Sequence, residues 1–123
     1  MQTESKQQTP TRSCARAIYW RAKPGQLDAY SSYLRQHVEP IDQAAQLQGA
    51  LTSFTTLVDA TADAPWTHMR LFMFSSHAQR EDMVAALARV AASLTPDEDQ
   101  RSARATLAAT LRERVGQADF DLL

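Results

Sequence analysis

The character of this sequence changes several times between strand-forming and helix-forming stretches, and that order limits what the chain can fold into. Stretches rich in β-branched and aromatic residues predict strands, while apolar residues recurring every three or four positions predict amphipathic helices. The predicted strands are 14–23, 51–58, 66–74 and a short alternating tail at 118–123. The predicted helices are 26–48, 77–94 and 95–116. The tail is either an edge strand or a frayed terminus.

Proline and glycine punctuate these stretches. Pro24 and Gly25 form a turn dipeptide after the first strand. Pro40 lacks an N–H, so we expect the first helix to kink or break near Glu39. Gly49 is placed to end that helix, and Gly116 to end the last one. The segment 95–98 predicts a helix start, with Thr95 as the cap, Pro96 in the first turn and Glu98 completing a capping box.

The order strand, helix, strand, strand, helix, extra helix, strand predicts a ferredoxin-like α+β fold. In this βαββαβ arrangement the helices cover one face of a four-stranded antiparallel sheet. The predicted strands carry bulky side chains on both faces, for example Trp20 and Tyr19 on opposite sides of the first strand. A monomer offers nothing to cover the second face, so we expect two copies to pack sheet to sheet as a homodimer.

Two local segments, AIYWRAKPGQLDAY and APWTHMRLFMF, together with this element order, make residues 14–123 resemble the dimeric α/β-barrel superfamily. This group includes antibiotic-biosynthesis-type monooxygenases, EthD-like proteins and stress-responsive barrel proteins. The resemblance implies a dimeric barrel with a pocket between the inner face of the sheet and the first helix. It implies little about chemistry, because barrels of this shape serve diverse functions.

Composition and charge remove several classes of function. A chain of 123 residues with 44% hydrophobic and 22% charged residues has the profile of one globular domain, expected at 14–123 after a flexible arm at 1–13. The interleaved charges, with a net charge of -1, argue against nucleic-acid binding. Cys14 is the only cysteine and the three histidines are dispersed, so neither a disulfide nor a metal site is expected. Without an apolar span or secretory pattern, we expect a cytoplasmic protein.

His68 and Arg70 are the first candidates for catalysis. They lie two positions apart in a predicted strand, so their side chains share one face. A neutral imidazole could remove a proton from a phenol or an activated C–H group, and a guanidinium could stabilise the resulting anion. The alternative is a structural polar pair at a sheet rim or a dimer interface.

Further candidates surround this pair in the predicted pocket. Tyr33 and His37 lie one helical turn apart and could share a proton path, or form an ordinary helix surface. Trp20, Trp66 and Phe72 could hold a planar or apolar ligand, although large aromatic residues are also common in cores.

Three functions fit these features. The first is a cofactor-independent monooxygenase, cyclase or isomerase that acts on a small aromatic or polyketide-like molecule. The second is a non-catalytic dimer that binds or senses a small apolar or aromatic ligand. The third is haem binding, with His37 or His68 as the axial ligand.

Overall fold

The computed structural model describes residues 13–123, so the predicted arm lies outside the described residues except for Ser13. Its four strands are β1 (Cys14–Ala22), β2 (Ser53–Val58), β3 (His68–Phe74) and β4 (Arg112–Asp121). Its α-helices are α1 (Leu27–Tyr33), α2 (Glu39–Leu47), α3 (His77–Glu81), α4 (Met83–Leu94) and α5 (Glu98–Leu111). A π-helical turn, Leu34–Val38, joins α1 to α2.

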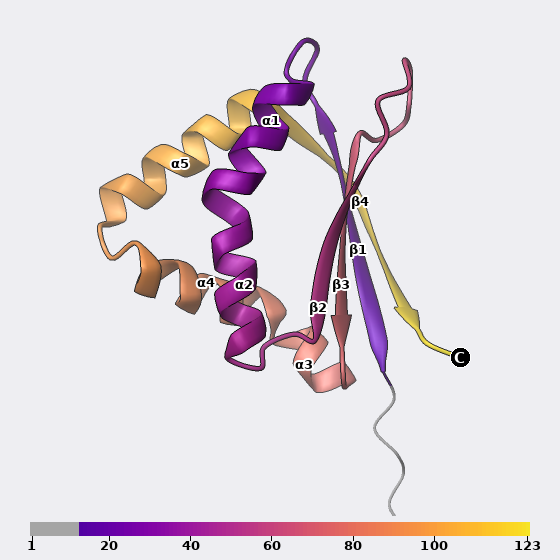
Figure 1. Ribbon diagram of the computed structural model, residues 1–123, viewed down its shortest axis with the longest axis vertical. Helices are drawn as coiled ribbons and strands as arrows, with labels where there is room; N and C mark the ends of the chain where they lie inside the picture. The colour runs from indigo at the N-terminus through magenta and orange to yellow at the C-terminus, as the bar shows by residue number, and fades with distance from the viewer. Residues whose placement is uncertain (1–12) are drawn as a thin grey trace, which may run out of the picture.

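The strands form one antiparallel sheet in the order β2-β3-β1-β4, with the helices on one face (Figure 1). β1 is central and pairs with β3 from Cys14–Phe74 to Trp20–His68. On its other side it pairs with β4 from Cys14–Asp121 to Ala22–Arg112. This arrangement confirms the predicted ferredoxin-like α+β fold, with α5 as the additional helix before the last strand.

Side chains on the inner face of the sheet build the core with the helices. Phe72 and Phe74 of β3 pack there with Cys14 of β1. Ala45, Met83 and Val90 from the helical layer and Leu51 from the loop before β2 complete this cluster. A second cluster lies around Tyr30, where α1 meets α5. The helical layer is therefore held to the sheet by apolar contact at two places.

The outer face of the sheet is also apolar, and none of the described helices covers it (Figure 1). By strand alternation and register, the apolar residues of this open face are Ala15, Ala17, Tyr19, Leu57, Met69, Leu71, Met73, Ala118 and Phe120. Leu57 is 42% exposed and Phe120 is 50% exposed. Two apolar faces on one sheet agree with the pattern predicted from the strands.

The predicted helix 95–116 is wrong at both ends. α5 begins after Asp97, whose side chain accepts the N–H groups of Asp99 and Gln100, so Thr95 is not the cap. The helix ends at Leu111, and Gly116 lies inside β4 opposite Tyr19, beside a shift in register. The edge of β1 offers hydrogen bonds to the following segment, and these favour an extended chain over further helical turns. The fourth strand is therefore longer than the predicted tail.

The α-helix is interrupted just before Glu39, where a kink or break was expected. The interruption is a π-helical turn, with the Glu39 N–H bonded to the Leu34 carbonyl, and the chain continues as α2 with Pro40 in its first turn. The predicted helix 77–94 is divided at Asp82 into α3 and α4. No helix between residues 13 and 123 is long and apolar enough to cross a membrane.

The cap of α5 gives a simple test of the corrected helix start. Asp97→Ala removes the side-chain acceptor for two N–H groups and should lower the free energy of unfolding by about 1 kcal/mol in urea denaturation. Glu98→Ala, the matched control, should change it little. A larger loss of stability in Glu98→Ala than in Asp97→Ala would instead support the capping box predicted between Thr95 and Glu98.

Candidate functional site

A cavity of about 110 Å³ lies between the first helical segment and the β2 side of the sheet. It is lined by Ser31, Leu34, Arg35, Glu39, Thr56, Val58 and His68. Part of its wall is the π-helical turn, a distortion that is frequent at functional sites. The cavity occupies the place that the barrel resemblance implies, between the inner face and the first helix. Its volume is that of about three or four liquid waters, so it can take one end of a small molecule.

His68 lines this cavity and is the first residue of β3. Its side chain has no exposed surface, and its Nε2 is 2.9 Å from Ser31 Oγ. Its Nδ1 is 2.7 Å from Thr67 Oγ1. The Tyr30 ring packs edge-on against the imidazole, with 4.5 Å between the centroids. Because Ser31 is only half-buried, its hydroxyl is the polar group through which the imidazole can communicate with the cavity.

The hydroxyl of Thr67 can serve either tautomer of His68. Thr67 Oγ1 accepts the Ala22 N–H at 2.7 Å, which uses one lone pair. Its remaining lone pair can accept Nδ1–H, and then Nε2 accepts the Ser31 O–H. Alternatively, the Thr67 O–H donates to Nδ1, and Nε2–H donates to Ser31. The three side chains therefore form a continuous path along which a proton can move.

Arg70 lies on the same face of β3 as His68, as predicted, but its guanidinium is engaged by protein groups. Its Nη2 donates to Asp42 of α2, and its Nε donates to Thr56 Oγ1 at 3.1 Å. The guanidinium carbon also lies 5.0 Å from the centroid of the Phe72 ring. Arg70 is 6% exposed and Asp42 is 1% exposed. Arg70 thus forms a buried ion pair rather than a donor directed into the cavity.

Burial lowers the pKa of His68 and raises the pKa of Asp42. Loss of hydration lowers the pKa of His68, and the positive charge of Arg70 lowers it further. Burial raises the pKa of Asp42 to about 6, although the adjacent Arg70 opposes this change. The desolvation cost of the Asp42 carboxylate therefore exceeds what the attraction to Arg70 returns. His68 is in its basic form at neutral pH.

The structure does not bring the other predicted site residues to this cavity. Tyr33 and His37 face α5, with 5.3 Å between their ring centroids, and line a separate groove. The Tyr33 hydroxyl donates to the Arg104 carbonyl at 3.2 Å. Trp20 lies under the Arg112 guanidinium, 3.7 Å from the ring centroid.

Trp66 and Phe72 are also outside the cavity. Trp66 packs against Tyr19 of the open face, with 5.7 Å between the ring centroids. Phe72 is 2% exposed and belongs to the core cluster. The predicted aromatic residues are therefore spread over the core, the open face and the α5 side, and they do not converge on His68.

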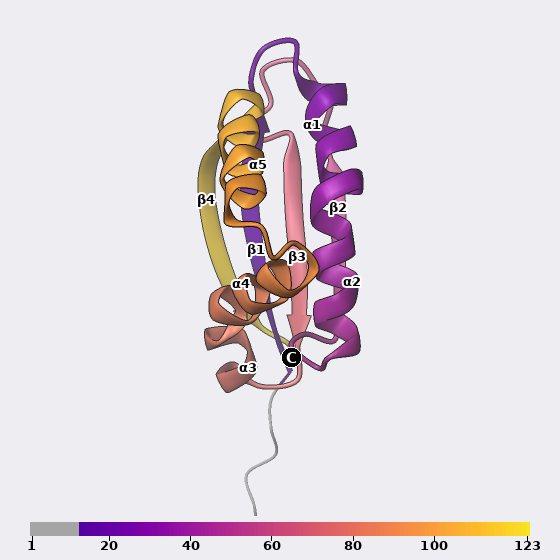
Figure 2. The same cartoon turned by 90° about the vertical axis from the view of Figure 1, so that its left-hand side faces the viewer.

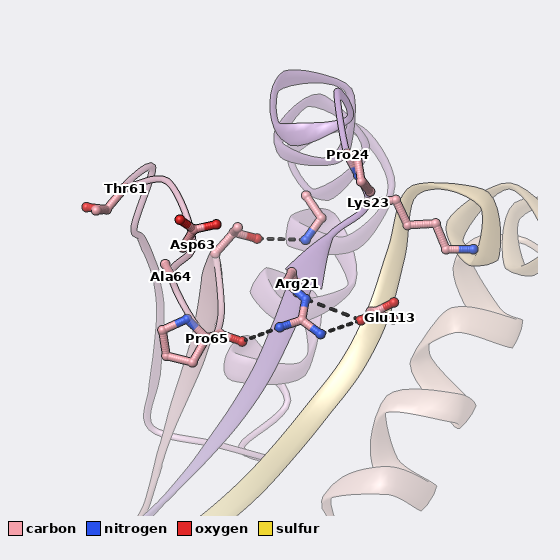
Figure 3. Close-up of a pocket in the computed structure, with 10 residues that line it drawn as sticks. Arg21, Lys23, Pro24, Thr61, Asp63, Ala64, Pro65 and Glu113 are labelled. Atoms are coloured by element: carbon pink, nitrogen blue, oxygen red, sulfur yellow. Dashed lines mark hydrogen bonds and ion pairs between the residues drawn. The ribbon is translucent and has the colours of Figure 1, made fainter.

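A larger cavity, about 590 Å³, lies where the loop between β2 and β3 approaches the end of β1. Figure 3 shows Arg21 at its centre, donating to the Pro65 carbonyl and to the Glu113 carboxylate. The Arg21 Nη2 to Glu113 Oε1 distance is 2.6 Å, and both side chains are about half exposed. This ion pair neutralises the charge of Arg21, and the cavity contains neither a histidine nor an aromatic side chain.

Comparison with solved structures agrees with this fold. HapK from Hahella chejuensis matches with a TM-score of 0.58 at 15% identity, covering 89% of this chain and 92% of that protein. SnoaB, a cofactor-independent oxygenase from Streptomyces nogalater, matches with a TM-score of 0.52 at 9% identity, covering 92% and 95%. A Chloroflexus aurantiacus protein, provisionally named an antibiotic biosynthesis monooxygenase, matches with a TM-score of 0.52 at 11% identity, covering 90% and 93%. No family model and no curated protein sequence matches the chain.

The chain shares its ferredoxin-like α+β fold with these three solved structures. At the level of fold, this finding agrees with the resemblance drawn from the sequence. At these identities the likeness extends to the fold alone. Within this fold, the cavity with Ser31 and His68 combines a neutral base with a partly exposed hydroxyl.

Three residues of this site were not predicted from the sequence. Ser31 and Thr67 are common helix-surface and strand residues, and Asp42 belongs to a polar helix face. A local signal existed only for Thr67, which precedes His68. Ser31 and Asp42 reach His68 and Arg70 from positions 37 and 28 residues earlier, so the tertiary fold alone reveals them.

Of the two histidines considered as haem ligands, His68 is engaged by protein groups. Both ring nitrogens of His68 have hydroxyl partners, and its cavity is much smaller than a haem. Within residues 13–123, no group of three or more histidine, cysteine, aspartate or glutamate side chains is arranged to hold a metal ion.

Asp42→Asn tests whether the buried carboxyl is costly to ionise. A folded-state pKa above the unfolded value means that Asp42 favours the native state below about pH 4, and that this contribution is lost as pH rises through about 6. Asparagine cannot ionise, so the variant should gain about 2 kcal/mol relative to the wild type between pH 4.5 and 7.5, measured by urea unfolding. Asp28→Asn on the exposed side of α1 should show no such gain. A variant that loses stability relative to the wild type as pH rises would contradict the raised pKa.

Proposed function

We propose that this protein is a cofactor-independent enzyme that removes a proton from a small aromatic or polyketide-like molecule. The proposal rests on one observation: a neutral, buried His68 is hydrogen-bonded to a serine hydroxyl at the wall of a cavity. Nucleophile or relay hydroxyls paired with an oriented imidazole are typical of proton-transfer sites. The fold similarity to SnoaB, a cofactor-independent oxygenase, supports the same class of reaction.

In the proposed step, Ser31 Oγ takes the proton of the substrate while its own proton passes to His68 Nε2. Thr67 accepts Nδ1–H and holds the imidazole in the tautomer that this transfer requires. The product is an enolate or a phenolate. It can take the proton back at another carbon, attack a carbonyl of the same molecule, or react with dioxygen. These three outcomes are isomerisation, cyclisation and oxygenation.

Arg35 and Arg70 have different parts in this proposal. Arg70 was predicted to stabilise the anion directly, but its donors face Asp42 and Thr56. We therefore assign it a positioning role, in which its charge adds to the effect of burial in lowering the pKa of His68. Arg35 lines the cavity and has no carboxylate within 4 Å among residues 13–123, so it is the cation available to an anion in the cavity.

Proton abstraction can be measured without knowing the natural substrate. An enolisable aryl ketone such as 2-tetralone, incubated with the protein in D₂O, should incorporate deuterium faster than in buffer, as followed by proton NMR. His68→Ala should abolish this acceleration, and Ser31→Ala should reduce it by about 10²-fold. His77→Ala, on an exposed side chain of α3, should leave it unchanged. Equal exchange by the wild type and His68→Ala would retire the assignment.

The pH dependence gives an independent check of the base. Because the pKa of His68 is lowered, the acidic limb of the exchange rate should have its midpoint below the ordinary imidazole value of about 6.5. Arg70→Met removes a positive charge next to the imidazole, so the acidic limb should move to higher pH. An unchanged limb in Arg70→Met would show that Arg70 does not act on His68.

We also propose that two copies pack through their open faces. Leu71 lies in the middle of β3, between Ala17 and Thr55 in register, and is half-buried in the single chain. Burial of this apolar face against a second copy removes it from water.

The open face can be tested by sedimentation. The wild type should sediment as a dimer at micromolar concentration, and Leu71→Glu should sediment as a folded monomer with unchanged circular dichroism. Val84→Glu, at a 69% exposed position of α4, should remain dimeric. A wild type that is monomeric at this concentration would contradict the barrel arrangement.

A non-catalytic binding protein is the second candidate, favoured by the small volume of the His68 cavity and the complete burial of the imidazole. A binding protein should be stabilised by an aryl ketone without promoting deuterium exchange. Thermal unfolding in the presence of the same ketone separates the two functions, since a ligand bound only by the native state raises Tm.

A further inference from the structure

A further cavity, about 430 Å³, lies on the α5 side of the molecule. It is lined by Trp20, Tyr33, Arg101, Ala105, Ala108, Ala109 and Arg112, and it shares none of these residues with the His68 cavity. Figure 2 shows α5 in front of β1, and α1 in front of β2. The two cavities therefore lie on different sides of α1. Its volume falls in the range of small-molecule sites.

The part of α5 that lines this groove carries short side chains. Residues 101, 105 and 108 follow helical spacing, so they lie along one side of α5, and Arg112 follows directly as the first residue of β4. Alanine at 105, 108 and 109 leaves open the space that longer side chains would fill. Opposite this wall are the aromatic rings of Trp20 and Tyr33. The groove therefore offers apolar contact of the kind that a flat ring fills.

The cavity also contains positive charge that no protein carboxylate neutralises. Within residues 13–123, neither Arg101 nor Arg112 has a carboxylate oxygen within 4 Å, whereas Arg16, Arg21 and Arg70 each do. Two guanidiniums at one groove favour an anion between them or on one of them.

Arg112 is held in place with part of its guanidinium unused. It stacks on Trp20 at 3.7 Å, and its Nη1 donates to the Tyr30 hydroxyl at 3.0 Å. Among residues 13–123 its Nε and Nη2 have no hydrogen-bond acceptor. This edge has the geometry of a bidentate carboxylate contact, and stacking on the indole fixes it in advance.

We propose that this groove binds a small aromatic carboxylate. The carboxylate lies on the Nε and Nη2 edge of Arg112, and the ring lies against the alanines of α5 and the Tyr33 ring. Arg101, whose Nη1 donates to the carbonyls of Thr95 and Pro96, adds a second positive charge at the far part of the groove. This site is independent of proton abstraction at His68.

Isothermal titration calorimetry with 2-naphthoate tests the proposal on the full chain. 2-Naphthoate should bind with one site per chain, and the neutral 2-naphthamide should bind at least tenfold more weakly. Arg112→Lys keeps the charge but loses the planar fork, so it should weaken 2-naphthoate at least tenfold. Ala105→Leu fills the groove from an exposed helix position and should have an effect of similar size.

Ala103→Leu is the matched control, because Ala103 is exposed on α5 and does not line the cavity. It should bind 2-naphthoate as the wild type does. Three results would each overturn the proposal: no binding at millimolar 2-naphthoate, equal binding of the amide or of inorganic phosphate, or unchanged affinity in Ala105→Leu. The last variant decides the outcome if Arg112→Lys does not fold.

Discussion

Arg70 places a positive charge beneath the helical layer, where Asp42 is the carboxylate that balances it. The pair joins the sheet to α2 across the core, and Thr56 of the edge strand accepts a further hydrogen bond from the same guanidinium. Burial makes the ionised carboxylate costly, so the contact positions groups more than it stabilises the fold. Burial lowers the pKa of His68 most, and the charge of Arg70, two residues away, lowers it further. The protonation state of the proposed base thus depends on how the helical layer covers β3.

The two faces of the sheet carry different sets of side chains because successive side chains of a strand point in opposite directions. The inner face carries His68, Arg70 and the aromatic core under the helices. The outer face carries Leu71 and its apolar neighbours, and the described helices leave it uncovered. On the inner side, cavities lie where the side chains are small. Ser31 leaves room beside His68, and the alanines of α5 leave room beside Trp20.

Most of the fold could be predicted because it depends on local patterns. Strand-forming segments, the turn at Pro24 and Gly25, and helical apolar stripes lead to the order of elements and to a sheet with two apolar faces. The prediction failed after Leu111, where the sequence continues a helical pattern but the chain becomes β4. The edge of β1, almost 100 residues earlier in the chain, supplies hydrogen bonds that local propensity does not contain.

For the site, the sequence alone determined that His68 and Arg70 share a face of a strand, because the two-residue period of a strand is a local property. Only the tertiary structure decided their partners. Ser31 and Asp42 come from the first helical segment, and their contacts with β3 depend on how that segment lies on the sheet. Tertiary packing likewise places Trp20 against Arg112, and Trp66 against Tyr19 of the open face. Hydrogen bonds and ion pairs join groups by distance in space, which spacing along the chain does not specify.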